Sequence, residues 1–207
     1  MKLCDMTLTD YLEVLRSNAP APGGGSASAL CGAQGAALVA MVAALTIGKK
    51  KYPLDQELCI EVEQRASELK DELLAQVDKD TAAFGLVSQA MKLPRESEEE
   101  REARAKEIAK ATYQATQVPF ETMELCLKGL QYAKALLGHS NTNAASDLGV
   151  AALNLNACMK GAWLNVLINI GGIDEEQADV FRIKGEKMVE KAERDSQEIY
   201  SVIRKSL

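Results

Sequence analysis

Residues 20–26 read Pro20-Ala-Pro-Gly-Gly-Gly-Ser26, and they open a segment, residues 27–48, that contains no charged residue. Three consecutive glycines allow backbone conformations closed to other residues and leave the backbone open to a ligand. Ser26 has a side chain that can cap the first free N–H groups of a helix, and such a helix start attracts anionic or carbonyl oxygens. The stretch therefore predicts a flexible entry joined to a rigid helix, which is typical of a ligand-binding edge.

The helix expected over residues 26–48 carries a small residue at every fourth position: Ser28, Gly32, Ala36, Ala40, Ala44 and Gly48. Such a row lets a neighbouring backbone come close, so this helix is expected at the centre of a bundle or dimer. The uncharged segment is also long enough to span a bilayer. Because it consists mostly of Ala, Gly and Ser, its tendency to insert is modest, and we expect a buried helix and no membrane association.

The composition is that of an all-α protein. The 207 residues are most simply one domain, 1–207, with few aromatics and five prolines. A net charge of −6 with no basic face argues against a nucleic-acid partner. The sequence shows no cleavable signal, and widely spaced cysteines fit reduced thiols, so a cytoplasmic location is expected. The cysteines are Cys4, Cys31, Cys59, Cys126 and Cys158.

Capping residues and helix breakers divide the remaining chain into further helices. No segment alternates as a strand would, so the fold class expected is all-α, a bundle of about six mostly long helices around the small-residue-rich central one. In addition to residues 26–48, the helices are expected over residues 7–17, 54–93, 97–137, 146–170 and 174–207.

One acidic residue interrupts the apolar stripe of the third expected helix. The stripe, with steps of three and four, is Leu69, Leu73, Val77, Asp80, Phe84, Val87 and Met91. A carboxylate on a buried face costs several kcal/mol, roughly, unless it is paired or hydrogen-bonded. Asp80 is therefore either bonded to a neighbouring helix or a functional acid. Asp78 lies about 200° round the helix from it, so the two do not share a site.

The fifth expected helix is apolar nearly all round, apart from one narrow stripe of polar and small residues. A helix of this kind is buried, and its stripe meets either partner side chains or a ligand. We interpret the stripe as the wall of a site, although an interhelical hydrogen-bond network is the alternative, and Asp147 alone has the place of a helix cap. The stripe comprises Asp147, Ala151, Asn154, Cys158, Gly161, Asn165 and Asn169.

Lys49, Lys50 and Lys51 follow the central helix, where they serve either as partners of the helix dipole or as an anchor for an anionic substrate tail. The single histidine, His139, has no neighbours spaced for a triad or a metal set, and no phosphate-binding loop is present. The sequence therefore predicts no metal and no cofactor. The chemistry that remains available is acid–base catalysis by carboxylates.

Four separated motifs together resemble one known family. They are Pro20-Ala-Pro-Gly-Gly-Gly-Ser26, Val77-Asp-Lys-Asp-Thr-Ala-Ala-Phe84, Ser146-Asp-Leu-Gly-Val-Ala-Ala152 and Asn165-Val-Leu-Ile-Asn169. In this order they resemble the C-terminal domain of formiminotransferase-cyclodeaminase, a family that includes free-standing methenyltetrahydrofolate cyclohydrolases. The resemblance covers nearly the whole chain. It implies an all-α homodimer that acts on folates, with Asp80 as the catalytic acid.

The resemblance further implies a methenyltetrahydrofolate cyclohydrolase that interconverts 5,10-methenyl- and 10-formyltetrahydrofolate. The expected substrate-binding residues are Pro22, Gly23, Gly24, Gly25, Ser26, Asp147, Asn154, Asn165, Asn169 and Lys50. Formiminotetrahydrofolate cyclodeaminase, which releases ammonia, is the close alternative. The family's transferase domain is absent from these 207 residues, and this favours the cyclohydrolase. A non-catalytic helical interaction protein is a more distant alternative.

Overall fold

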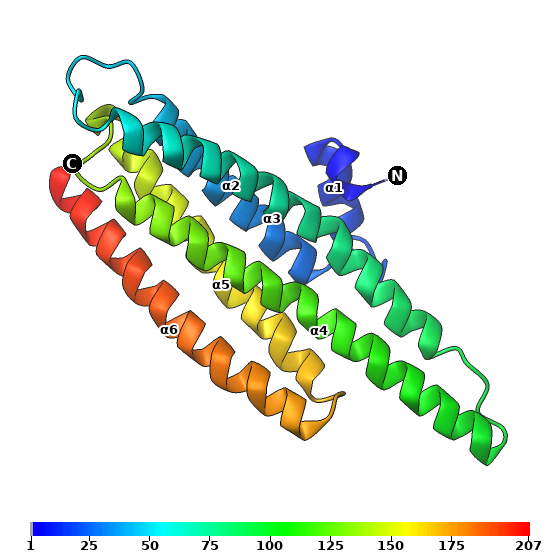
Figure 1. Cartoon of the computed structure of the whole chain (residues 1–207). Coiled ribbons are helices and arrows are strands. Elements are labelled where there is room, and N and C mark those ends of the chain that lie inside the picture. Colours follow the sequence, from blue (N-terminus) through cyan, green and yellow to red (C-terminus); the bar gives the residue numbers. More distant parts are fainter. Residues whose placement is uncertain (1) are drawn as a thin grey trace.

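The computed structural model describes residues 2–207, which form a bundle of long helices with no strand (Figure 1). The all-α expectation is confirmed, and each expected helix is present. The α-helices are α1 (Leu8–Leu15), α2 (Gly24–Ala44), α3 (Gln56–Ala90), α4 (Glu98–Ala135), α5 (Ala145–Ile170) and α6 (Glu175–Ser206). Two short 3-10 helices, η1 (Leu3–Asp5) and η2 (Thr142–Ala144), precede α1 and α5.

Helix α2 lies at the centre of the bundle, between α3 and α5, as its row of small residues predicted. A Cβ atom at Gly32 would stand 2.7 Å from the Cys158 sulfur, and one at Gly35 would stand 2.8 Å from Leu155 Cγ. Glycine thus permits the close approach of α2 and α5. By length and composition α2 could also cross a membrane. Within the bundle, however, Val39 and Val42 are fully buried, as in the core helix of a globular fold.

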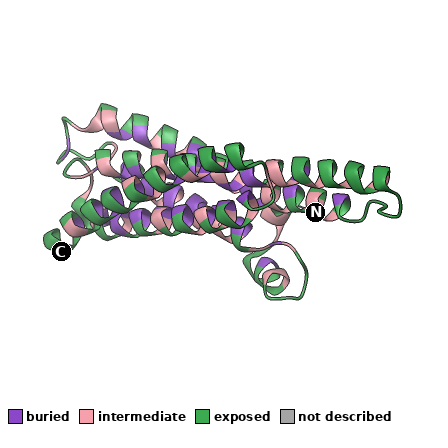
Figure 2. Cartoon of the chain, turned by 90° about the horizontal axis from the view of Figure 1, so that it is seen from below, coloured by how far each residue is buried: buried purple, intermediate pink, exposed green. Residues whose placement is uncertain are grey.

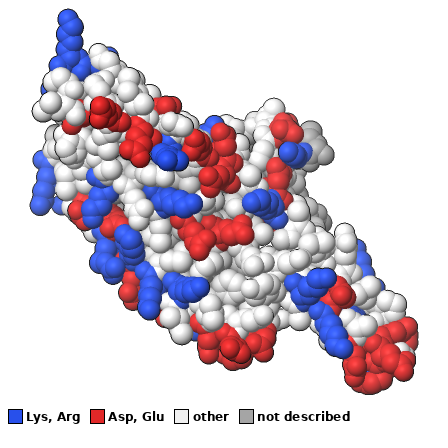
Figure 3. All heavy atoms as spheres, viewed as in Figure 1, with Lys and Arg blue, Asp and Glu red and all other residues white. Residues whose placement is uncertain are grey.

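Helices α3 and α4 form a hairpin that extends past the other helices at one end of the bundle (Figure 1). A capping box between Ser97 and Glu100 starts α4, which continues through Pro119 without a break. The tip of the hairpin is mostly exposed and strongly acidic (Figures 2 and 3). Helix α1 lies apart on the flank of the bundle, where Tyr11 packs against Ala29 of α2 and Val77 of α3.

Candidate active site

The triglycine segment begins α2 earlier than its sequence suggested. The helix starts at Gly24, and Gly23 is its N-cap without any side-chain capping bond. The expectation that Ser26 caps the helix is therefore wrong. Because Ser26 falls in the first turn, its side chain points sideways into the bundle, where it is fully buried against α3.

Ser26 holds the carboxylate of Asp80. Its Oγ lies 2.8 Å from Asp80 Oδ2, 3.1 Å from the carbonyl oxygen of Val77 and 3.2 Å from Thr81 Oγ1. A hydroxyl has one proton to donate, and an ionised carboxylate is its strongest acceptor here. Asp80 therefore takes the fixed orientation expected of an acid bonded to a neighbouring helix, and it does so at the end of a pocket.

Gly25 leaves the space that the Asp80 carboxyl group fills. A Cβ atom at Gly25 would overlap Oδ1 and would lie 2.6 Å from the carboxyl carbon. A side chain at this position would have to displace the carboxylate. The last glycine of the motif thus allows an acidic side chain to lie directly against the positive end of α2.

Burial raises the pKa of Asp80 above its ordinary value of 3.8, because the charged form loses hydration. Hydrogen bonds from the Ser26 hydroxyl and backbone lower the pKa and partly oppose this effect. The carboxyl group is thereby moved toward the range in which an acid–base catalyst can both accept and return a proton.

A pocket of about 510 Å³ opens in front of Asp80, between the start of α2, the outer half of α3, α4 and the end of α5. Asp80 is the one charged residue in its lining, which otherwise consists of apolar side chains, two asparagines, one threonine and glycine backbone. The pocket is lined by Pro20, Ala21, Gly23, Gly24, Gly25, Asp80, Phe84, Val87, Met91, Ile108, Thr112, Ala115, Asn165, Ile168, Asn169 and Gly172.

The two asparagines form a fixed polar edge of this pocket. Asn165 Nδ2 donates to the carbonyl oxygen of Gly161, 2.8 Å away, and a Cβ at Gly24 would lie 3.5 Å from the same nitrogen. Asn169 Nδ2 donates to the carbonyl oxygen of Ala115 in α4, at 2.9 Å. These bonds restrain both amides, so that they can present polar atoms to a bound heterocycle.

The structure thus brings six of the predicted site residues together in one pocket: Gly23, Gly24, Gly25, Asp80, Asn165 and Asn169. Ser26 and Pro22 are buried next to it and do not line it. Ser26 instead orients Asp80, as described above.

Three other predicted substrate-binding residues lie outside the pocket. Lys50 is exposed in the turn after α2, Asp147 is in the first turn of α5, and Asn154 faces Cys31 near the middle of the bundle. At 1.5 Å per residue, Asp147 and Asn165 are about 27 Å apart along α5. Within one chain, Lys50 and Asp147 therefore belong to the end of the bundle opposite Asp80.

The sequence assigned the outer part of the α3 stripe to the core, and this was wrong. Phe84 is 43 % exposed and Met91 is 55 % exposed, and with Val87 they line the pocket. Sequence reasoning also missed Ile108 and Thr112 of α4, because they fall in or beside a charged run, residues 95–110, and such a run is typical of a solvent-exposed helix face. The signal was present, since Ile108, Thr112 and Ala115 have the spacing of one helix face.

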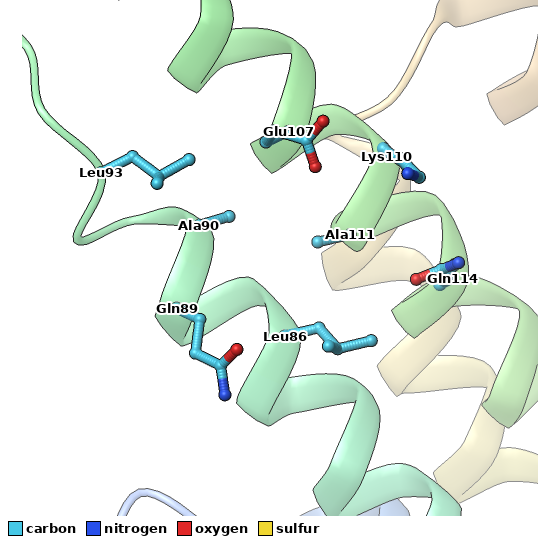
Figure 4. Close-up of a pocket in the computed structure, with 8 residues that line it drawn as sticks. All are labelled: Leu86, Gln89, Ala90, Leu93, Glu107, Lys110, Ala111 and Gln114. Atoms are coloured by element: carbon cyan, nitrogen blue, oxygen red, sulfur yellow. The ribbon is translucent and has the colours of Figure 1, made fainter.

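A second groove lies on the opposite side of the α3–α4 hairpin, where the Leu86 side chain points toward α4 (Figure 4). Its charged residues, Glu107 and Lys110, are exposed. No buried acid faces this groove among the residues that line it, and it contains none of the predicted site residues.

Comparisons with known proteins agree on one family. The family model for formiminotransferase-cyclodeaminase matches residues 7–189. A methenyltetrahydrofolate cyclohydrolase of Methylorubrum extorquens is 37 % identical over 199 residues, which cover 96 % of each chain. The formimidoyltransferase-cyclodeaminase of Gallus gallus is 34 % identical over 180 residues, but the match covers only 32 % of that longer protein. A crystal structure of formiminotetrahydrofolate cyclodeaminase from Thermotoga maritima superposes with a TM-score of 0.81 at 28 % identity, covering 98 % of this chain and 96 % of the other.

Proposed function

The chain belongs to the formiminotransferase-cyclodeaminase family, and on that premise we propose that it is a methenyltetrahydrofolate cyclohydrolase. It would interconvert 5,10-methenyltetrahydrofolate and 10-formyltetrahydrofolate. Support comes from the cyclohydrolase of M. extorquens, which matches this chain over nearly the full length of both proteins.

The observation that carries the proposal is the isolated carboxylate in an otherwise uncharged pocket. The methenyl substrate carries a cation delocalised over N5, the bridging carbon and N10. A single carboxylate in a poorly hydrated site attracts such a cation more strongly than it would in water. The apolar walls formed by Phe84, Val87 and Ile108 suit the flat faces of the pterin and benzoyl rings.

In the proposed mechanism the oxygen of a water molecule attacks the bridging carbon, while the Asp80 carboxylate takes one proton from that water. The tetrahedral adduct then collapses: the C–N5 bond breaks, the remaining hydroxyl proton passes to N5, and the C=O bond of the formyl group forms on N10. The net reaction consumes one water and releases one proton. Ser26 keeps the Asp80 carboxylate in place throughout.

The test is a spectroscopic assay of the loss of the methenyl chromophore with purified protein. We expect wild-type protein to accelerate this loss, and Asp80→Asn to reduce kcat by about 10²–10⁴-fold, the range of general acid–base catalysis. Asp78→Asn is the matched control, because Asp78 accepts from the backbone of Leu3 and lies outside the pocket. Equal rates for wild-type protein and Asp80→Asn would exclude Asp80 from the mechanism.

The second candidate is formiminotetrahydrofolate cyclodeaminase, which is favoured by the structural similarity to the T. maritima enzyme. Here N10 attacks the carbon of the protonated formimino group, and Asp80 would take the N10 proton and return it to the nitrogen of that group. The bond between the carbon and this nitrogen then breaks, which releases ammonia and leaves the methenyl cation. Measuring ammonia release from the formimino substrate beside the methenyl assay separates the two activities.

We propose further that the enzyme needs no cofactor or metal, is a cytoplasmic homodimer, and has no nucleic-acid or membrane partner. Among residues 2–207, no group of three or more His, Cys, Asp or Glu side chains is placed to hold a metal ion. Chelator treatment that abolished activity would contradict the proposal of metal independence.

A further inference from the structure

Helices α2 and α5 share an open face that is almost free of charge. Helix α2 contains no charged residue, and α5 contains only Asp147 and Lys160, of which Lys160 pairs with Glu193 of α6. The most exposed apolar side chains of this face are Ile168, at 78 %, and Leu164, at 67 %. Its other exposed members are Gln34 and Met41 on α2, Leu45 directly after α2, and Val150, Leu153 and Ala157 on α5, and each set follows one face of its helix with steps of three, four or seven residues.

The two stripes point to the same side of the molecule. The Cys31 sulfur donates to the carbonyl oxygen of Asn154, at 3.4 Å, where the two helices meet. Gln34 lies three residues after Cys31, and Ala157 lies three residues after Asn154, so each is turned about 60° round its helix from the point of contact. Because α2 and α5 run in opposite directions, these equal rotations bring both residues to one side. The stripes therefore form one continuous apolar surface, larger in extent than the scattered apolar residues of an ordinary monomer surface.

The two ends of this surface carry different chemistry. One end borders the pocket, because Ile168 belongs to both the open face and the pocket lining. The other end carries the exposed turn of Lys49, Lys50 and Lys51, of which Lys51 donates to Thr142 just before α5. The pocket itself contains no cation to bind the glutamate carboxylates of a folate. Within one chain the lysine turn is too far away to supply one.

We propose that a second copy of this chain covers the α2–α5 face in a twofold antiparallel arrangement, and that the partner's lysine turn completes the pocket around Asp80. This inference rests on the proposed function, since it assigns the lysines to the anionic tail of the folate. In a twofold interface the same surface of each subunit is used, and opposite ends meet.

The positions along the helices fit this arrangement. The midpoint between Gly24 and Lys50 is residue 37, and the midpoint between Asp147 and Asn165 is residue 156. Both midpoints lie near the centre of the open face. A twofold axis at this position places the lysine turn of one chain beside the pocket of the other. The acidic hairpin tip, with Glu96, Glu98, Glu99 and Glu100, then lies at the same end as the partner's basic turn.

A mixed dimer tests whether the site is shared. Asp80→Asn and Lys50→Glu chains carrying different tags are co-expressed, and the mixed dimer is purified on both tags. Each variant alone should lose activity, Lys50→Glu chiefly through a raised KM for a polyglutamylated substrate. The mixed dimer carries one intact site and should recover about half of the wild-type activity per dimer. Lys187→Glu, an exposed lysine of α6, is the control for charge reversal.

Cross-linking gives a readout that does not depend on catalysis. A mixed dimer of Lys50→Cys and Ala21→Cys chains should form an interchain disulfide under mild oxidation, whereas each variant alone should not. Leu164→Glu should convert the dimer to a monomer in analytical ultracentrifugation, while Val202→Glu, on exposed α6 surface, should leave it dimeric.

Several outcomes would overturn the inference. They are a monomeric wild-type protein, a mixed dimer no more active than its parents, an unchanged KM in Lys50→Glu, or an α2–α5 face that binds neutral phospholipid vesicles instead of a second copy. If wild-type protein dimerises and the mixed cysteine variants cross-link as expected, but wild-type protein acts on neither folate, the proposed function fails and the antiparallel dimer stands. In that case the assignment of the lysines to a folate tail falls with the proposed function.

Discussion

Ser26 Oγ lies 2.8 Å from Asp80 Oδ2, and this contact joins the first turn of α2 to the middle of α3. The two residues are separated by 54 positions in the chain. The hydroxyl is fully buried and the carboxylate borders the pocket, so one side chain fixes the geometry while the other meets the substrate.

Replacing Ser26 with Ala should raise the pKa of Asp80 further, because the hydroxyl stabilises the charged form. If ionised Asp80 is the base, the acid limb of the pH–rate profile moves to higher pH, and activity falls more at low pH than at high pH. Ser28→Ala is the control, since the Ser28 hydroxyl bonds only within α2, to the carbonyl oxygen of Gly24. A uniform loss of activity at all pH values would contradict this role of Ser26.

Gly25→Ala should displace the Asp80 carboxyl group, because a methyl group at this position overlaps it. Overpacking of this kind costs about 1–3 kcal/mol, and it should also lower kcat by moving the acid. The control is Gly85→Ala in α3, outside the pocket, since a Cβ atom there meets no other atom within 4 Å. Thermal unfolding and steady-state kinetics of both variants provide the measurements, and equal kinetics would argue against close contact of Gly25 with the acid.

Asp80→Asn should stabilise the fold at neutral pH while it removes activity. Burial holds the pKa of Asp80 in the folded protein above its ordinary value of 3.8. Between pH 3.8 and the raised pKa, the folded state therefore binds more protons than the unfolded state. The free energy of unfolding therefore falls as the pH rises from 3.8 through the raised pKa. The uncharged amide avoids this loss, and Tm should rise by a few degrees at pH 7.

The difference in Tm between wild-type protein and Asp80→Asn should shrink as the pH is lowered toward 3.8, where the wild-type carboxyl group also becomes neutral. Calorimetry across this range measures the effect. A difference that stays constant with pH would show that it arises from packing and not from ionisation.

Phe84→Ala should weaken folate binding by about 1–3 kcal/mol, through loss of an aromatic wall, and should appear mainly as a raised KM. Because Phe84 is 43 % exposed, Tm should change little. Leu86→Ala is a matched control, since Leu86 is 46 % exposed on the same helix and faces the groove on the other side of the hairpin (Figure 4). The same KM in both variants would exclude Phe84 from the binding surface.

The sequence by itself determined the helices and the central place of α2, because these follow from local rules. Periodicity, caps and breakers act over a few residues, and the row of small residues that includes Gly32 and Ala36 favours a close helix–helix contact. The acid was also found locally, since Asp80 breaks an apolar stripe. The ends of α2 were less well predicted, because Gly24 and Gly25 carry little helix propensity and enter the helix through packing.

Only the tertiary structure decided which polar residues share a site. Ser26 and Asp80, or Asn169 and Ala115, meet because four helices, α2 to α5, pack in one particular register, and no local pattern encodes that register. For the same reason the sequence could not separate pocket wall from core along Phe84, Val87 and Met91: an apolar side chain has the same spacing whether it faces a neighbouring helix or an open pocket. The place of Lys50 at the end of the bundle opposite Asp80 likewise depends on the direction of α2, which is set when the helices assemble.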